Sequence, residues 1–482
     1  MAKRYKTAQH TIMRKMGSAR EILEKIPNVV AVGIGLKETD GEFTDEIAFR
    51  VFVTEKKPKN ELKKHEIIPK EIEGHKTDVL IPYHITNEAF VERQNTKDVR
   101  PLQGGIAMGN DKEQGAYGTL GWFARLNDNT LVILTNKHVL YDVTLATDTS
   151  INKAAQAFYS KSCCCECGVI GQTIIGIKNN TVDCALATIN ADIGTSLRIT
   201  NDSTDQILKV AGTAQAVIGN AKKIGARSIF TKGKIVHIGD AAAAATDPAG
   251  GAITVHPDQL IIIPAPEETY ENENGKKAFS NPGDSGSAIL DDDNKMVGLL
   301  WGGDASSNSV KLTFANNIDK VVAALTASGH AITIAVSPDG GEKNLVSRKK
   351  PKVLQGSQPS LTQLQRMVPE EWSDLIAKHR PEIMSLINTS KKTGTIWQRY
   401  QGPAFTVHFM NSMNDPYYII PKEIKNTSFT TLLVKMADVL KECGSQPLKD
   451  SIGNHGFAII SAAEEASSVK DFIVKLSNPV SV

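Results

Sequence analysis

The stretch Asn281–Ser287 (NPGDSGS) contains residues that could act together in catalysis. Glycines on both sides of the Asp284-Ser285 pair allow a sharp turn that exposes the Ser285 hydroxyl, while the amide N–H groups of Gly283 and Ser285 can point into one hollow. Such a turn supplies a nucleophile and an oxyanion hole together. A solvent-exposed turn between two strands would use the same residue types. The motif therefore needs partners elsewhere in the chain before it indicates catalysis.

Two residues upstream could complete a proton-transfer system. His138 follows the apolar strand Leu131–Leu134, and an imidazole held at a strand end can take a hydroxyl proton near neutral pH. Asp183 lies in the apolar stretch 182–187 (VDCALA), where a carboxylate is costly unless it is paired. By itself His138 could be a core histidine, and Asp183 could cap a turn. Together with Ser285, in this order, they predict a catalytic triad in which Asp183 orients His138.

The elements that must position this triad are short strands. From Pro101 to Val336, apolar runs alternate with Gly, Asn and Asp, which is typical of an all-β barrel or sandwich. A helix from Asn317 to about Leu325 closes this domain. The expected strands include Gly118–Ala124, Leu131–Leu134, Val169–Ile175, Val182–Ile189, Lys234–Ile238, Gln259–Ile263, Ser287–Leu290 and Val297–Trp301.

The motifs around these three residues resemble those of the trypsin-like (chymotrypsin-fold) serine proteases. The resemblance rests on TNKHVL around His138, GDSGS around Ser285, and the order His138, Asp183, Ser285. Residues 222–236 resemble the strand pair that bacterial members carry between the aspartate and the serine, and residues 297–303 resemble the strand that lines the substrate cleft. The resemblance implies a double β-barrel and a serine endopeptidase that acts on protein or peptide substrates without a cofactor.

The same resemblance implies a substrate pocket and raises the question of how the enzyme is activated. It places Phe279 at the base of the primary specificity pocket and Trp301, Gly302 and Gly303 on its wall. Since Phe279 is not an acid, we expect a small or apolar residue rather than Arg or Lys at the cleavage position. Trypsin-like zymogens insert a new N-terminus beside the aspartate next to the nucleophile, and no suitable cleavage boundary precedes Gly104. Activation is therefore expected to use the extra domains, oligomerisation or cleavage in a linker.

The first 100 residues predict a small α+β regulatory domain. A helical pattern covers about 11–26, strands 29–35 and 47–53 flank an Asp40-Gly41 turn, and a charged helix and a third strand near 78–83 follow. Residues 28–79, joined through Arg100-Pro101 to 104–109, are similar to bacterial relatives of the plant narrow-leaf proteases.

The remaining chain predicts a linker and a helix-rich α+β domain. Residues 337–360 are polar and rich in Gly and Pro, and their basic centre (348–352) could contact nucleic acid, act as a targeting signal or simply be solvated. In 361–482, an apolar stripe begins after Ser428 as N-cap and stops at Gly444. Cys443 lies on this apolar stripe and is therefore expected to be a core residue. Strands are expected at 405–410 and 457–460.

Composition limits the function classes. The 482 residues suggest two to four domains, and 41% hydrophobic with 22% charged residues is typical of globular proteins. A formal net charge of +2 implies neither a nucleic-acid nor a membrane partner. Since no signal peptide or apolar run of membrane-spanning length is evident, we expect a cytoplasmic protein. It could form a homo-oligomer.

Four of the six cysteines cluster at 163, 164, 165 and 167. Four thiolates could hold zinc, but consecutive cysteines are a poor tetrahedral set, so we expect no metal and a reduced, redox-sensitive loop instead.

Two alternatives to the endopeptidase remain. One is a scaffold or binding protein whose protease fold has an occluded or latent site, and the other is an esterase that uses the same triad.

Overall fold

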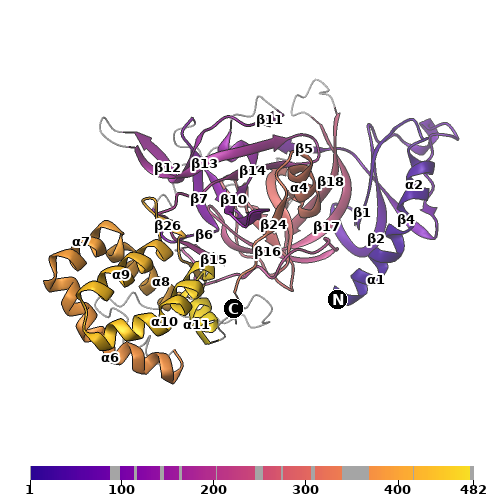
Figure 1. Cartoon of the computed structure of the whole chain (residues 1–482). Coiled ribbons are helices and arrows are strands. Elements are labelled where there is room, and N and C mark those ends of the chain that lie inside the picture. The colour runs from indigo at the N-terminus through magenta and orange to yellow at the C-terminus, as the bar shows by residue number, and fades with distance from the viewer. Residues whose placement is uncertain are drawn as a thin grey trace. The chain divides into compact units, whose positions relative to one another are not determined.

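The computed structural model of the protein forms two compact units. It describes all residues except 1, 87–97, 113–116, 142–145, 162–165, 202, 245–252, 273–274, 305–309, 339–367, 416 and 478–482. The first unit comprises 1–99, 103–189 and 198–348, and the second comprises 100–102, 190–197 and 349–482. Figure 1 colours the chain along its length, so that the strands of the first unit run from indigo to salmon and the helices of the second are orange to yellow. The domain limits predicted above, at residues 100, 336 and 360, stay predictions.

Two large sheets build the first unit (Figure 1). The eleven-stranded sheet runs in the order β16 (Gly219–Gly225), β20 (Ala288–Leu290), β21 (Met296–Asp304), β23 (Thr313–Asn317), β18 (Ile253–Pro264), β17 (Ile229–Ala244), β1 (Val29–Thr39), β2 (Glu42–Val53), β4 (His75–Leu80) and β3 (Glu71–Ile72), with β5 (Tyr83–Thr86) beside β17 and β21. The nine-stranded sheet runs β24 (Ile332–Ile334), β9 (Trp122–Leu126), β10 (Leu131–Thr135), β14 (Asp183–Ala187), β13 (Glu166–Lys178), β12 (Lys153–Lys161), β7 (Ile106–Asn110) and β8 (Gly118–Leu120), with β11 (Thr147–Asp148) beside β13. A small pair, β19 (Lys277–Ala278) and β22 (Val310–Lys311), accompanies them. The β-rich region predicted between 101 and 336 is therefore present, with α3 (Lys137–Leu140) and α4 (Ile318–Ala327) as its helices.

The closing helix begins where the sequence predicts. The Asn317 side chain accepts a hydrogen bond from the Asp319 N–H at 3.3 Å and caps α4. Ile318, Val321 and Leu325 are the buried residues of this helix. Their spacing places them on one face, so that packing rather than propensity holds α4 in place.

The N-terminal hairpin continues the larger sheet. β1 pairs with β2 as expected from the Asp40-Gly41 turn, and its other edge pairs with β17, where Gly33 lies opposite Gly239. The helical pattern at 11–26 belongs to two helices, α1 (Ala2–Met13) and α2 (Met16–Leu23). The expected charged helix after β2 is wrong, because only the short 3₁₀ turn η1 (Lys59–Glu61) forms there. None of the residues of η1 is buried, so no apolar face is present there to stabilise a surface helix.

The second unit is mainly helical. Its helices are α6 (Glu370–Thr389), α7 (Lys391–Arg399), α8 (Gly402–Asn414), α9 (Phe429–Cys443), α10 (Gln446–Glu465) and α11 (Val469–Ser477). Short strands are β25 (Tyr418–Ile419), β26 (Glu423–Ile424) and β27 (Thr427–Ser428), and β25 pairs with residues 195–196 of β15 (Thr195–Ile199). The remaining strand of the chain is β6 (Leu102–Gly104), whose Leu102 N–H donates to the Gly194 carbonyl at 2.9 Å.

Helix α9 confirms one prediction, while α8 and α10 correct two others. The Ser428 hydroxyl accepts the Thr431 N–H at 3.0 Å, and Gly444 follows the last helical residue. The strands expected at 405–410 and 457–460 are wrong, since both segments lie inside helices. Phe457 is 70% exposed, so the apolar run did not mark a buried strand. Both segments are short apolar runs, which periodicity cannot assign to strand or helix.

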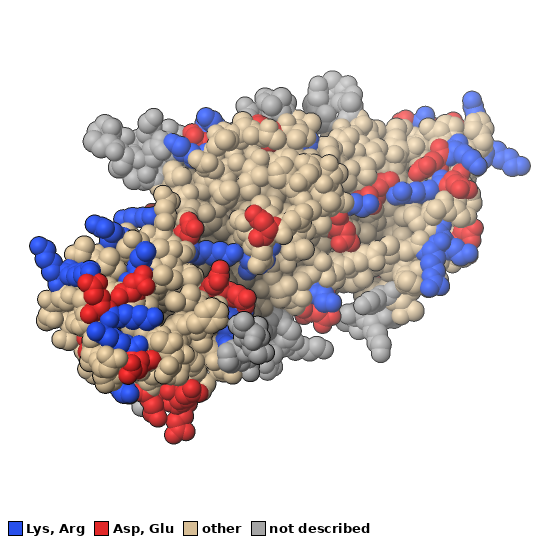
Figure 2. Space-filling model, viewed as in Figure 1, with Lys and Arg blue, Asp and Glu red and all other residues tan. Residues whose placement is uncertain are grey.

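Charges of both signs are interspersed on the face of the molecule shown in Figure 2. No helix among the described residues has the length and apolar character needed to cross a bilayer.

Candidate active site

The histidine and the aspartate meet because their strands are neighbours. β10 pairs with β14, with Thr135 opposite Ala185, and the chain leaves β10 through Asn136 into the single turn α3 that carries His138. Asp183 is the first residue of β14. The Asn136 side chain donates to the Asp183 carbonyl at 2.6 Å and ties the two strand ends together.

The Asp183 carboxylate is held by several donors. Its Oδ2 lies 2.8 Å from Nδ1 of His138, and its Oδ1 accepts the N–H groups of Lys137 at 2.7 Å and of His138 at 3.3 Å. The side chain of Asp183 is almost fully buried. Burial alone would raise the pKa of this carboxyl, but His138 and Lys178 outweigh it and lower the pKa well below the usual range. Asp183 is therefore an ionised partner that fixes the orientation of the imidazole.

The turn that contains Ser285 depends on two glycines. Gly283 and Gly286 adopt φ values of 98° and 94°, which side chains with a Cβ disfavour. The N–H groups of Asp284 and Gly286 donate to backbone carbonyls at 2.9 and 2.8 Å. Within the part of the chain that the structure describes, the N–H groups of Gly283 and Ser285 donate to no protein acceptor. Two such N–H groups beside one hydroxyl are the donors that an oxyanion hole requires, and their role as one stays a prediction.

Hydrogen bonds of Thr119 and Thr135 connect this turn to β10, the strand that precedes His138. The Thr119 N–H donates to the Ser285 carbonyl at 2.7 Å, and the Thr119 hydroxyl donates to the Gly283 carbonyl at 2.9 Å. Thr135, the last residue of β10, donates its hydroxyl to the Thr119 carbonyl at 2.8 Å. The Ser285 backbone is therefore linked, through Thr119, to Thr135, which lies three residues before His138.

Close packing supports the same placement. A Cβ added to Gly118 would lie 2.3 Å from a methyl of Val139 and 2.8 Å from the Ser285 carbonyl oxygen. The residue after His138 and the backbone of Ser285 thus approach the same small space. Among the described residues, no hydrogen bond joins the Ser285 hydroxyl to the His138 ring. Catalytic hydrogen bonds are often long in ligand-free structures and tighten when a substrate binds.

The aspartate beside the nucleophile has an internal partner. Asp284 is fully buried and its carboxylate accepts the N–H groups of Arg227 at 2.9 Å and Ser228 at 3.0 Å. The ammonium of Lys223, also fully buried, lies 3.2 Å from Oδ2. Burial lowers the pKa of Lys223 while Asp284 opposes that shift. The charge of Asp284 is therefore balanced by Lys223 of β16, without a newly cut N-terminus.

Phe279, one of the four predicted pocket residues, lies beside this buried pair. Phe279 is fully buried, and the Nζ of Lys223 lies 5.5 Å from its ring centroid. Trp301 donates its Nε1–H to Gln259 at 2.8 Å, and its ring centroid lies 5.3 Å from that of His256.

Gly302 and Gly303 lie in β21 and pair with Phe314 and Thr313 of β23. The assignment of Phe279, Trp301, Gly302 and Gly303 to a specificity pocket stays a prediction.

Sequence reasoning missed two residues that contact Asp183. The Lys178 ammonium lies 3.1 Å from Oδ2, and the Asn316 side chain accepts the Asp183 N–H at 2.9 Å. Lys178 could have been found, because a short turn separates it from Asp183 and a hairpin would place them opposite each other. Asn316 comes from a distant strand, and no local pattern points to it.

The predicted loop of Cys163, Cys164 and Cys165 lies outside the described residues, as does the side chain of Cys167. In the described ranges, no group of three or more His, Cys, Asp or Glu side chains could hold a metal ion. Cys184 is buried, and burial raises its pKa, so its thiol is unreactive at neutral pH.

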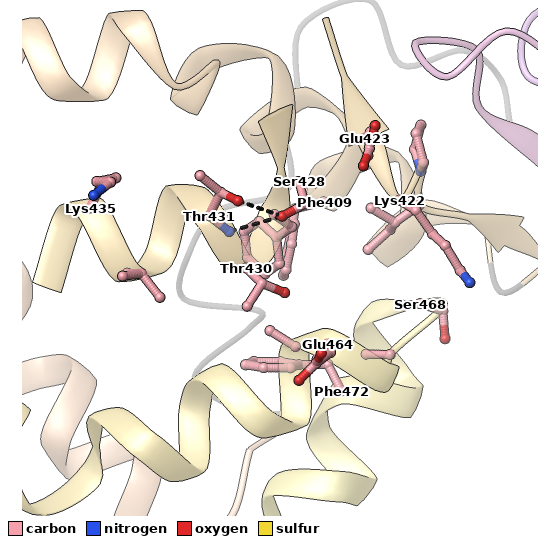
Figure 3. Close-up of a pocket in the computed structure, with 16 residues that line it drawn as sticks. Phe409, Lys422, Glu423, Ser428, Thr430, Thr431, Lys435, Glu464, Ser468 and Phe472 are labelled. Carbon is pink, nitrogen blue, oxygen red and sulfur yellow. Dashed lines mark hydrogen bonds between the residues drawn. The ribbon is translucent and has the colours of Figure 1, made fainter. Parts of the chain in front are cut away.

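The second unit contains cavities of its own. Figure 3 shows one of about 550 Å³, where Phe409 and Phe472 approach the start of α9 and Ser428 caps that helix. Lys422, Lys435 and Glu464 place charges of both signs around it. A second cavity, of about 420 Å³, is lined mainly by apolar residues of α6, α9, α10 and α11. Neither cavity is lined by a residue of the predicted triad.

No protein-family model matches the chain, and no curated protein sequence does. Solved structures similar to it include the chymotrypsin of Cellulomonas bogoriensis, at 17% identity and a TM-score of 0.33, over 49% of this chain and 100% of that one. Protease A of Thermobifida fusca matches at 14% identity and a TM-score of 0.33, over 49% and 100% of the two chains. The Rv3671c protease of M. tuberculosis, in its active form, matches at 12% identity and a TM-score of 0.27, over 53% and 97%. These three are trypsin-like serine proteases.

Proposed function

We propose that the chain is a trypsin-like serine endopeptidase that hydrolyses peptide bonds of a protein substrate. The observation that carries the proposal is the buried, ionised Asp183 held 2.8 Å from Nδ1 of His138, beside a Ser285 turn whose flanking amides are unpaired within the described structure. A structural histidine would not require a nucleophile turn with two such amides nearby. The combination is the one that acyl transfer needs.

The mechanism follows from these contacts. His138 accepts the hydroxyl proton as Ser285 attacks the peptide carbonyl, and the negative charge of Asp183 stabilises the imidazolium that forms. The N–H groups of Gly283 and Ser285 stabilise the oxyanion. His138 then gives the proton to the leaving amine, and water releases the acyl group by the reverse sequence of steps. No cofactor takes part.

Further features of the proposal come from the sequence. We place the enzyme in the cytoplasm and expect the regions before 101 and after 336 to restrict access or recruit a particular substrate. Phe279 and Trp301 would favour a small or apolar residue at the cleavage position. The narrower similarity to bacterial relatives of the narrow-leaf proteases is part of this proposal.

Labelling with a fluorophosphonate probe tests the proposal. The wild-type chain should be labelled, and Ser285→Ala should abolish labelling because the attacking oxygen is gone. Ser287→Ala is the matched control, since Ser287 lies in the same turn but donates its hydroxyl to the Asp284 carbonyl. Equal labelling of wild type and Ser285→Ala would reject Ser285 as the nucleophile.

A latent site is the second candidate, because Ser285 is only 9% exposed. It predicts a folded wild-type protein that the probe does not label until a trigger opens the site. An esterase with the same triad would be distinguished by cleaving small esters and leaving a peptide library intact.

A further inference from the structure

A lysine reaches the carboxylate of the proposed triad from the opposite strand. Lys178 ends β13, Asp183 begins β14, and the antiparallel register places them directly opposite each other. Directly opposed residues have Cβ atoms about 5 Å apart, which lets a lysine reach a neighbouring carboxylate. The Nζ of Lys178 lies 3.1 Å from Oδ2 of Asp183, the same oxygen that His138 contacts.

The turn between these strands fixes that juxtaposition. The Asn179 side chain accepts the N–H groups of Thr181 at 2.8 Å and Val182 at 2.9 Å, and the Asn179 N–H donates to the Val182 carbonyl at 2.9 Å. An asparagine that bonds the backbone two residues on is typical of tight turns. The hairpin is thus locked in the register that brings the ammonium to Asp183.

We propose that Lys178 is a positioning residue that holds the Asp183 carboxylate in place and keeps the imidazole of His138 neutral to a lower pH. This inference rests on the proposed function. The ammonium and the imidazolium would compete for one oxygen atom, and two like charges so close to each other disfavour protonation of the weaker base. His138 would then remain able to accept the Ser285 proton in mildly acidic solution.

Among the described residues, the neighbouring elements carry few other charges that could act on His138. On α3 itself, Lys137 is fully buried with its Nζ 6.0 Å from the Tyr141 ring, and it acts electrostatically on Asp148 of β11. From β7, the neutral Asn110 donates to the Val139 carbonyl at 3.0 Å.

His256 of β18 also feels the charge of Lys178. Burial lowers the pKa of His256, and the charge of Lys178 lowers it further. Lys178, whose side chain is 22% exposed, is the described cation that shares an oxygen of Asp183 with His138.

The first test is the pH dependence of fluorophosphonate labelling. In Lys178→Met the apolar stem remains and the charge is lost, so the acidic limb of the labelling rate should move up by about one pH unit, while the rate at high pH changes little. Lys178→Arg should restore the wild-type limb. Lys320→Met is the matched control, because it removes the same charge from a half-exposed ion pair with Asp258.

The second test does not depend on activity. In histidine-labelled protein, the NMR titration of His138, assigned with His138→Gln, should move to higher pH in Lys178→Met and return in Lys178→Arg. An unchanged His138 titration overturns the inference, and so does a labelling rate lowered equally at every pH. If the wild type is never labelled, the proposed function fails, and the NMR titration still decides the role of Lys178.

Discussion

Asp183 and Asp284 are two buried carboxylates that lie in the first unit, and each contacts a lysine. Asp284 is sealed together with Lys223, since both side chains have no exposed surface. Asp183 shares its charge between His138 and a partly exposed Lys178. A sealed ion pair can hold a turn in one shape, whereas a carboxylate that also contacts a partly exposed histidine can respond to a proton. The same residue type therefore has a structural role at Asp284 and, in the proposed function, a chemical role at Asp183.

The largest expected effect comes from Asp183→Asn. It keeps the shape of the side chain but no longer favours the tautomer that leaves Nε2 of His138 free to accept a proton, so kcat/KM should fall by about 10⁴-fold. Steady-state kinetics on a peptide substrate found by library screening measures it. A loss below tenfold would mean that Asp183 does not orient the base.

Lys223→Met should have the largest effect on stability. It leaves the Asp284 carboxylate buried and without its ion-pair partner, which costs about 3–5 kcal/mol of the free energy of unfolding. Chemical denaturation measures the loss, and Lys223→Met combined with Asp284→Asn should recover part of it.

Lys178→Met is the matched contrast to that variant. Without the Lys178 ammonium, Asp183 still contacts His138 and accepts two backbone N–H groups, so the stability loss should be smaller than that of Lys223→Met. Equal losses for the two lysine variants would remove the distinction between the two carboxylates.

A smaller effect should appear in the pH dependence of stability. The pKa of Asp183 is lower in the folded chain than in the unfolded chain, so its ionised form stabilises the fold above the unfolded pKa of about 4. That contribution is lost as the pH falls through the lowered pKa of the folded state. The difference in unfolding free energy between wild type and Asp183→Asn should therefore be steady from pH 6 to 8 and shrink below about pH 4. A difference that grows in acid would contradict the assigned direction.

Much of the candidate site could be predicted because its parts are local. Glycines at 283 and 286 permit the strained turn, and an apolar strand before His138 holds that residue rigidly. Ser428 and Gly444 marked the ends of α9 for the same reason, since a cap acts on its own helix. Segments 405–410 and 457–460 were misassigned because a short apolar run fits either a strand or a buried helix until its partners are known.

Turns, caps and the residue types able to do chemistry could be located from sequence, since these depend on backbone freedom and on neighbours within a few residues. The folded chain was needed to show that Lys223 pairs with Asp284, that Asn316 binds the Asp183 backbone and that β1 extends the sheet at β17. Those contacts join residues far apart in the chain. Burial makes an unpaired charge or amide costly, so the partner is selected by what the folded sheets bring within reach, and no local pattern records it.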